Sequence, residues 1–315
     1  MNEHLHGVGA TMLRGGLGKN MILKTIRGAA LLALLSGCAA FDSLGGDSLG
    51  GSSGLGGLFS GKSRTEKPIE EYTAEEIFRR GEYEAEQGNY KEAAKWFGEV
   101  ERLYPYGEWA KRSVIMQAFS WHKQKKYDEA RSAAQRFLDF YPGDEDAAYA
   151  QYLLALSYYD QIEDVGRDQK LTLQALQELR KVIEQYPNTE YARSAVLKFE
   201  LAFDHLAAKE MEVGRYYLKR GNYTAAANRF RKVVENFQTT TQVPEALYRL
   251  VESYLSLGLK DEAQTAGAIL GYNFQSTDWY QDAYKLLTDN GLQPKARGDN
   301  WLASIYRQLV KGEWL

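Results

Sequence analysis

The sequence is poor in the residues that most often build catalytic and metal sites. Its 315 residues include one cysteine and four histidines. A single cysteine excludes a disulfide within the chain. The apolar run at residues 28–35 is far shorter than the ~20 residues that a membrane-spanning helix needs, so it does not predict a transmembrane segment.

An excess of positive charge is also missing. Lysine and arginine number 39 against 42 acidic residues, for a formal net charge of −3. Residues 1–37 carry four basic residues and one acidic residue, so removing them makes the chain more acidic. Nucleic acid is therefore not an expected partner, because binding to phosphates requires a basic surface.

The one cysteine has an informative position. Cys38 directly follows the small residues Ser36 and Gly37 and the short apolar run, and Lys24 and Arg27 supply positive charge upstream. This is the layout of a bacterial lipoprotein signal. We expect cleavage before Cys38 and acylation of its thiol, since two or more acyl chains anchor a protein stably. The alternative is an ordinary secretory signal with an incidental cysteine.

Two further features concern the ends of this segment. Ala39 stands where an aspartate would, by resemblance to lipoprotein sorting rules, favour the inner membrane, so the outer membrane facing the periplasm is the expected destination. Met21 would start a more compact signal, which makes residues 1–20 a candidate for a misassigned start. Residues 38–67, rich in glycine and serine, predict a lipidated flexible tether that reaches ~30 Å.

From about residue 70 the sequence repeats itself. One marker is an alanine in each second helix, at Ala93, Ala130, Ala175, Ala226 and Ala263. The other is an aromatic residue followed by Pro or Gln, at Tyr104, Tyr141, Tyr186, Phe237 and Phe274. The two series have the same spacings, which are those of a helix-turn-helix unit resembling a tetratricopeptide repeat. The alanines predict close helix approach and the prolines predict helix ends.

The predicted fold is therefore all-α, a right-handed solenoid of five tetratricopeptide-like helix pairs with C-terminal capping helices. Residues 68–190 hold repeats one to three, residues 191–290 hold repeats four and five with a cap, and residues 291–315 form a C-terminal extension. Two longer spacings are explained by a polar insertion at 160–170 and a long helix over 191–220. Residues 279–287 and 301–310 predict closing helices that cover the last apolar face.

No catalytic motif with a plausible structural context is present. The string from Gly46 to Gly50 matches a nucleophile elbow, but it lies in the tether without a preceding strand or following helix. Of the histidines, His122 and His205 remain after removal of the signal, and neither has a partner at metal-ligand spacing. We expect no enzyme activity, no metal and no cofactor other than the lipid on Cys38.

A solenoid of helix pairs offers a groove lined by the first helix of each repeat. The tetratricopeptide pattern places ten side chains there: Phe78, Glu82, Ile115, Phe119, His122, Lys123, Tyr149, Tyr152, Leu156 and Tyr159. Aromatic rings near cations suit an extended peptide that ends in an aromatic residue and a carboxylate. Some of these rings could instead pack between the helices.

A second candidate surface is electrostatic. Residues 213–234 contain six cations and no acidic residue: Arg215, Lys219, Arg220, Arg229, Arg231 and Lys232. Such a concentration predicts a positive patch that attracts an acidic protein partner, and the planar guanidinium groups favour carboxylates. The alternative is a solvated face without a partner.

Taken together, these features resemble the ComL/BamD family, the lipoprotein component of the machinery that assembles β-barrel proteins in the outer membrane. The run HLAAKEMEVGRYY at residues 205–217 carries the resemblance most specifically, and the similarity covers residues 66–290. Members of that family are not enzymes.

The resemblance implies that the N-terminal repeats receive the C-terminal signal of unfolded barrel proteins. It also implies that the C-terminal repeats hold the periplasmic POTRA domain of the insertase and companion lipoproteins. Asn228 and Arg229 match the insertase-contacting region, which makes Arg229 the best single interface candidate. The alternatives are a tetratricopeptide lipoprotein that coordinates envelope division or peptidoglycan synthesis, and a lipid-anchored hydrolase.

Overall fold

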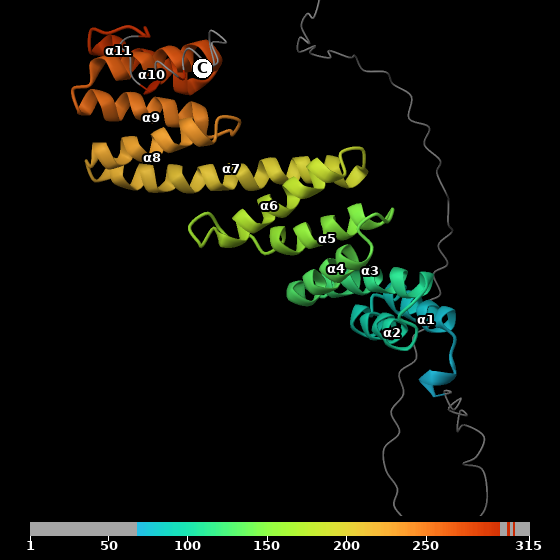
Figure 1. Ribbon diagram of the computed structural model, residues 1–315. Helices are drawn as coiled ribbons and strands as arrows, with labels where there is room; N and C mark the ends of the chain where they lie inside the picture. Colours follow the sequence, from blue (N-terminus) through green and yellow to red (C-terminus); the bar gives the residue numbers. More distant parts are fainter. Residues whose placement is uncertain (1–67, 297–300, 303–304, 306–315) are drawn as a thin grey trace, which may run out of the picture. The chain divides into compact units, whose positions relative to one another are not determined.

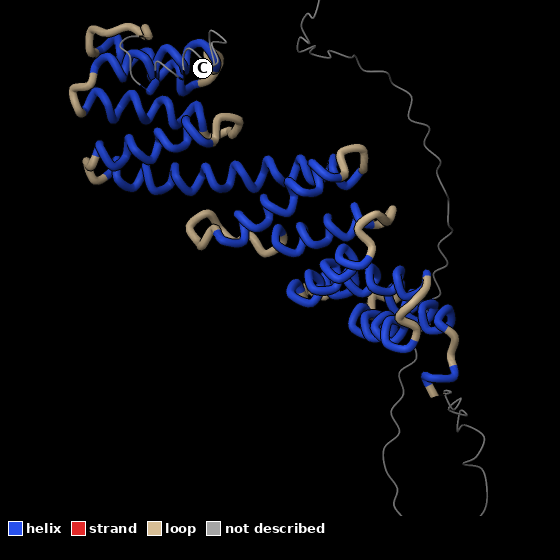
Figure 2. The backbone as a smooth tube through the Cα atoms, in the orientation of Figure 1, coloured by secondary structure: helices blue, strands red, loops and turns tan. Residues whose placement is uncertain are grey.

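The computed structural model describes residues 68–296, 301, 302 and 305, and Figures 1 and 2 show this part as helices joined by short loops. A 3-10 turn at Ile69–Glu71 comes first. The α-helices are α1 Ala74–Glu86, α2 Tyr90–Leu103, α3 Glu108–Lys123, α4 Tyr127–Phe140, α5 Ala147–Tyr159, α6 Lys170–Gln185, α7 Glu190–Lys219, α8 Tyr223–Asn236, α9 Val243–Ser256, α10 Lys260–Asn273 and α11 Asp278–Asp289. The predicted signal, the tether and Cys38 lie outside the described residues.

The helices pair as the repeat predicts. Each helix from α1 to α10 packs against the next, and α11 packs against α9 and α10. The five pairs confirm an all-α solenoid of tetratricopeptide-like units with a cap. The two predicted irregularities are also confirmed, because α5 and α6 are separated by the segment 160–169, and α7 is a single helix of 30 residues.

The ends of the second helices share one local structure. Tyr104, Tyr141, Tyr186, Phe237 and Phe274 all follow the last helical residue with φ between −127° and −136°, and each donates its backbone N–H to the carbonyl four residues earlier. In the first three repeats a proline follows and blocks continuation. Repeats four and five end in the same conformation without proline, so the proline is not required for this helix end.

The marker alanines lie in the core. Ala93, Ala130, Ala175, Ala226 and Ala263 are all fully buried. Phe97, Phe137 and Phe230 fill the space beside them and are fully buried as well. The core therefore lies between the two helices of each pair and between neighbouring pairs.

The C-terminal extension contributes to this core. Leu302 is fully buried and Ile305 nearly so, and both belong to the apolar cluster formed by α7 to α11. Trp301 packs on the edge of the same cluster. The remainder of the predicted closing helix at 301–310 lies outside the described residues. None of the described helices is long and apolar enough to cross a membrane.

Candidate functional site: a groove on the first helices and a basic surface on α7 and α8

The first helices of the repeats form a continuous row. Besides the contacts within pairs, α1 packs against α3, α3 against α5, and α5 against α7 (Figure 1). The row therefore runs one helix further than the sequence predicts, because α7 continues it beyond the third repeat.

Phe119 and Lys123 of α3 form one part of this row. The ring of Phe119 meets Tyr90 edge to face, with centroids 6.0 Å apart. Nζ of Lys123 lies 5.3 Å from the Phe119 centroid, within cation-π range. The aromatic ring and the neighbouring cation that the sequence predicts are thus brought together here.

His122 meets a carboxylate that the sequence analysis did not include. Its Nε2 lies 3.1 Å from Oδ2 of Asp160, the residue that directly follows α5. Nε2 is buried and forms no well-aligned hydrogen bond. The imidazole and the carboxylate are therefore close in space without being hydrogen-bonded. Tyr127 packs edge-on against the imidazole at 5.5 Å between centroids. Asp160 therefore adds negative charge to the middle of the predicted groove.

Tyr149 and Tyr152 cluster with a tyrosine from α7. Their ring centroids lie 5.2 and 5.6 Å from that of Tyr191. Burial raises the pKa of Tyr149, Tyr152 and Tyr191 above the ordinary value for tyrosine. A tyrosine hydroxyl is protonated at neutral pH even without such a shift, so these hydroxyls can donate hydrogen bonds.

Tyr159 lies further along the same row. Nζ of Lys198, from α7, is 5.1 Å from the Tyr159 centroid. Lys198 and Tyr191 were missed because the predicted groove ended with repeat three, although the long helical stretch after residue 190 was visible in the sequence.

Two predicted groove residues belong to the core instead. Phe78 is 1% exposed and packs between Phe97 and Trp109, with centroids 5.3 and 5.1 Å away. Ile115 is 5% exposed and lies in the cluster between α3, α4 and α5. The apolar stripe of a first helix is wider than its groove side, so spacing alone placed both residues on the wrong side.

The predicted basic patch is largely neutralised within the chain. Arg215 pairs with Glu245 at 2.8 Å, and Arg229 pairs with Glu210 at 2.9 Å. Lys232 also pairs with Glu210. The acidic partners, Glu210 and Glu245, lie outside residues 213–234 and contact the patch because the helices pack together. The net positive charge of the patch is therefore lower than the composition of residues 213–234 predicts.

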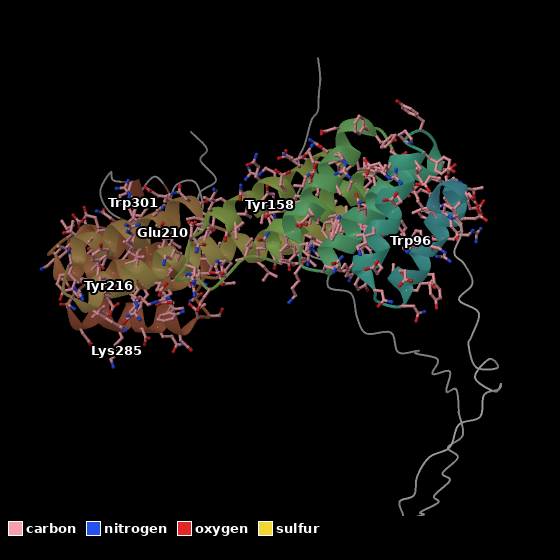
Figure 3. All side chains as sticks on the ribbon, turned by 90° about the horizontal axis from the view of Figure 1, so that it is seen from below. Trp96, Tyr158, Glu210, Tyr216, Lys285 and Trp301 are labelled. Atoms are coloured by element: carbon pink, nitrogen blue, oxygen red, sulfur yellow. The ribbon has the colours of Figure 1, made fainter. Side chains whose placement is uncertain are left out.

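The Arg231 side chain contacts both a carboxylate and an aromatic ring. It pairs with Glu235 at 2.8 Å, and its guanidinium lies 4.6 Å from the Trp301 ring centroid. Figure 3 shows Trp301 and Glu210 on the C-terminal helices.

Lys219 and Arg220 differ from the other four cations of the patch. Both are exposed where α7 ends, and neither forms an ion pair with any residue that the structure describes. The guanidinium of Arg220 lies 4.5 Å from the ring centroid of Tyr216, which is half exposed (Figure 3). These three residues form a cation and aromatic surface at the turn from α7 to α8.

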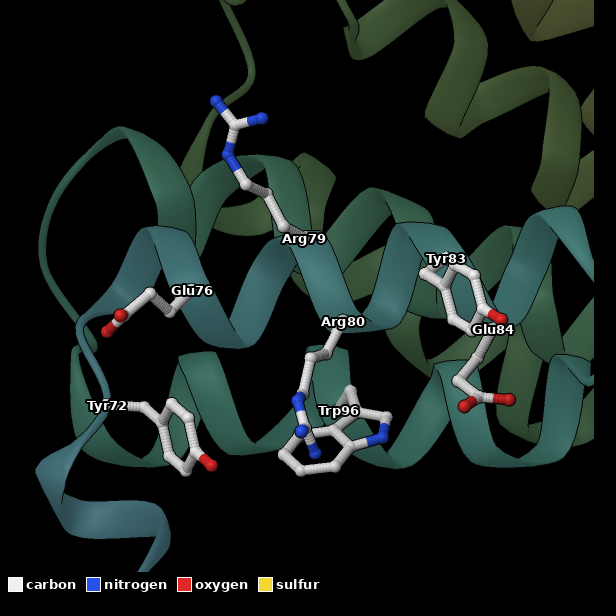
Figure 4. Close-up of a pocket in the computed structure, with 7 residues that line it drawn as sticks. All are labelled: Tyr72, Glu76, Arg79, Arg80, Tyr83, Glu84 and Trp96. Atoms are coloured by element: carbon white, nitrogen blue, oxygen red, sulfur yellow. The ribbon is translucent and has the colours of Figure 1, made fainter. Parts of the chain in front are cut away.

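A separate cavity of about 600 Å³ lies beside repeat one (Figure 4). The Arg80 guanidinium lies between two rings there, 5.4 Å from the Tyr72 centroid and 5.1 Å from the Trp96 centroid. Arg79 and Tyr83 face the same cavity. The sequence analysis does not predict this cavity, because its walls come from α1, α2 and the residue Tyr72 before α1, which meet only in the folded chain.

The described residues hold no group of three His, Cys, Asp or Glu side chains close enough to bind a metal ion. His205 packs beside Gln169, with Nδ1 3.4 Å from Oε1. The candidate surfaces are an aromatic row and an exposed cationic turn on a helical scaffold of the tetratricopeptide-like class.

Comparison with known proteins identifies the family. The model of the YfiO family, described as outer membrane lipoprotein, matches residues 70–269. The outer membrane protein assembly factor BamD of Caulobacter vibrioides is 51% identical over 71% of this chain and 74% of its own length. BamD of Rickettsia prowazekii is 42% identical over 73% of this chain and 93% of its own. The chain therefore belongs to the YfiO family of outer membrane lipoproteins, also named BamD.

A solved tetratricopeptide protein of Thermus thermophilus aligns with 69% of this chain and all of its own chain, at 20% identity and a TM-score of 0.33. The family assignment rests on the sequence matches.

Proposed function

We propose that the protein is a non-catalytic, lipid-anchored scaffold of the machinery that assembles β-barrel proteins in the outer membrane. The observation that carries this proposal is the 51% identity, over most of the chain, to a protein named as an assembly factor of outer membrane proteins. Acyl chains on Cys38 hold it at the outer membrane, and the repeats work on the periplasmic face. No cofactor is needed for such a role.

In this proposal the row of first helices binds the C-terminal segment of an unfolded barrel protein. The support is the row itself, where Phe119, Tyr152 and Tyr159 offer aromatic surface and Lys123 and Lys198 offer positive charge. Protonated tyrosine hydroxyls can also donate hydrogen bonds to the peptide backbone.

The C-terminal repeats dock onto the periplasmic POTRA domain of the insertase and onto companion lipoproteins. Lys219, Arg220 and Tyr216 are the strongest candidates for the contact. The two cations are exposed and pair with no carboxylate in the described part of the chain, and the Tyr216 ring lies beside Arg220. Arg229 is less suitable for a charge-reversal test. Arg229→Glu would place a second carboxylate beside Glu210, so it could disturb the fold as well as the contact with a partner.

Affinity purification from membranes tests the proposal. The wild-type protein should co-purify a β-barrel insertase, and intact mass should show acyl chains on Cys38. The double variant Lys219→Glu/Arg220→Glu should lose the insertase, whereas Lys285→Glu, an exposed lysine on α11, should retain it (Figure 3). Wild-type protein that co-purifies peptidoglycan synthases and no insertase would refute the assignment.

A further inference from the structure

Two turns of the N-terminal repeats carry unusually exposed aromatic rings. Tyr106, between α2 and α3, is 93% exposed, and Phe140, the last residue of α4, is 70% exposed. No other large hydrophobic side chain that the structure describes is as exposed as these two. Because α3 and α4 pack together as a helical hairpin, the start of α3 and the end of α4 lie at the same end of the pair. Phe119 and Lys123 lie at the opposite end of α3, so the two rings are separate from that part of the row of first helices.

The repeat architecture does not require either ring. Neither Tyr106 nor Phe140 belongs to a core cluster of the described residues. The position of Phe140, directly before the marker aromatic residue, is occupied in the other repeats by Leu103, Gln185, Asn236 and Asn273. The position of Tyr106, two residues after the marker, is occupied by Gly143, Asn188, Thr239 and Ser276. Packing within the solenoid therefore does not account for the two aromatic side chains.

A half-buried ion pair fastens the two turns to each other. Nζ of Lys111, in the first turn of α3, donates a hydrogen bond of 2.8 Å to Oδ2 of Asp144, in the turn that follows Phe140. The other carboxylate oxygen of Asp144 accepts a hydrogen bond from the backbone N–H of Asp146. These hydrogen bonds lower the pKa of Asp144, so its carboxylate stays charged at neutral pH. The turns that carry the rings are thus held in place before any partner arrives, which lowers the ordering cost of binding.

The same end of the hairpin has an excess of negative charge. The hydrogen bond to Asp144 raises the pKa of Lys111 despite partial desolvation, and the charges of Glu108 and Asp146 add to this effect. Three carboxylates therefore surround one lysine. Glu145 lies in the same turn, and both Glu108 and Glu145 are exposed and form no ion pair within the described part of the chain.

We propose that Tyr106, Phe140, Glu108 and Glu145 form a docking surface, the aromatic edge, for a folded protein whose face combines basic residues with an apolar depression. The exposed rings suit an apolar depression, and the carboxylates suit neighbouring lysines or arginines. The carboxylates repel nucleic acid, an anionic lipid surface and the same edge of a second copy. The inference goes beyond the proposed function, because the aromatic edge is separate from both the row of first helices and the turn from α7 to α8.

Site-specific photo-crosslinking in cells tests the inference. The photoreactive residue p-benzoylphenylalanine replaces one residue at a time in the full-length chain, and mass spectrometry identifies the cross-linked peptides after illumination. Positions 106 and 140 should capture the same folded protein, at a face that contains lysine or arginine. Position 272 is the matched control, because Tyr272 on α10 is 63% exposed, and it should not capture that face. Position 220 reports separately on the proposed contact with the insertase.

A second arm tests the charge and the ring. Glu108→Lys/Glu145→Lys should reduce the cross-link from position 106 about ten-fold or more, because it brings like charges together. Asp282→Lys/Asp289→Lys makes the same change of charge on exposed residues of α11 and should leave this cross-link unchanged. Tyr106→Ala should reduce the cross-link from position 140 several-fold, and because the ring is almost fully exposed, its removal leaves the packing of the repeats intact.

The outcomes separate the aromatic edge from the proposed function. Cross-links from position 220 to the insertase, with no protein captured at positions 106 and 140, would overturn the aromatic edge alone. Capture of unfolded barrel proteins or of a second copy of this chain at these positions would assign the surface to another role and would also overturn it. A cross-link from position 106 that is unchanged in Glu108→Lys/Glu145→Lys would contradict the basic partner.

Discussion

The ring of Phe97 on α2 lies directly on the backbone of Gly81 on α1. A Cβ atom built on Gly81 would stand 2.6 Å from Cε1 of Phe97. Phe230 on α8 covers Gly214 of α7 in the same manner, at the same separation along the chain. The first and fourth repeats therefore use the same contact between helices, although α7 is much longer than α1.

Because of this contact, even a methyl side chain at position 81 should destabilise the protein. Gly81→Ala should lower the free energy of unfolding by about 1–3 kcal/mol, because the methyl group forces the Phe97 ring out of its position. Urea denaturation measures the change. Gly143→Ala is the control, since no atom lies within 4 Å of its Cβ position. Adding Phe97→Leu to Gly81→Ala should cost less than the two single effects together, and strict additivity would contradict the steric explanation.

One turn residue is in an unfavourable conformation. Lys125 has φ of 60°, and the corresponding turn positions in three other repeats are Gly88, Gly221 and Gly258. Lys125→Gly should stabilise the protein by about 0.5–1 kcal/mol, because relief of left-handed strain exceeds the added entropy of the unfolded chain. Lys126→Gly, at φ of −87°, should destabilise it instead. Thermal unfolding of the two variants gives the comparison, and a loss of stability in Lys125→Gly would show that strain is not significant there.

The repeat architecture could be predicted because its signals are local. An alanine that permits close helix approach and an aromatic residue at the helix end recur in every unit, and both mark the same structure in all five repeats. The candidate groove was only partly predictable. Phe78 and Ile115 share the spacing of groove residues but face the core. Asp160 and Lys198 come from segments that approach the groove only after folding.

The basic patch shows the same limit for charge. Within residues 213–234 no acidic residue is present, yet Glu210 and Glu245 neutralise three of the cations through contacts between helices. The composition of a segment counts only the charges that are close in sequence, whereas ion pairs also form between residues that are distant in sequence and close in the fold. The cations without such neighbours, Lys219 and Arg220, are distinguished only by the structure.

Glu210 links stability to pH. Burial raises its pKa, but hydrogen bonds from Lys232 and Arg229 outweigh burial and lower the pKa below the ordinary value of 4.5. A lowered carboxylate pKa contributes stability that is present above the unfolded value and is lost as the pH falls through the folded value. The C-terminal repeats should therefore lose stability below about pH 4.5 in part through this residue.

Glu210→Gln isolates this contribution. At pH 7 the variant should be less stable by about 1–2 kcal/mol, because two cations lose a charged partner. Its stability should also fall less steeply than that of the wild type below pH 4.5. Denaturation series at several pH values measure both effects, with Glu235→Gln as the control on a more exposed pair. Parallel pH profiles for Glu210→Gln and wild type would rule out this role of the carboxylate.

The last prediction concerns the C-terminal extension, which lies beyond the residues matched by the family model. Leu302 is fully buried in the apolar cluster of α7 to α11, so Leu302→Ala should cost about 2–4 kcal/mol through lost burial and a cavity. In a chain of repeats such a loss acts mainly on neighbouring units. Hydrogen exchange should therefore accelerate in α8–α10 and stay unchanged in α1–α4.

Trp301→Ala, which removes a ring at the edge of this cluster and its contact with Arg231, should have a smaller effect in the same helices. Equal exchange rates in wild type and Leu302→Ala would show that the extension does not stabilise the C-terminal repeats.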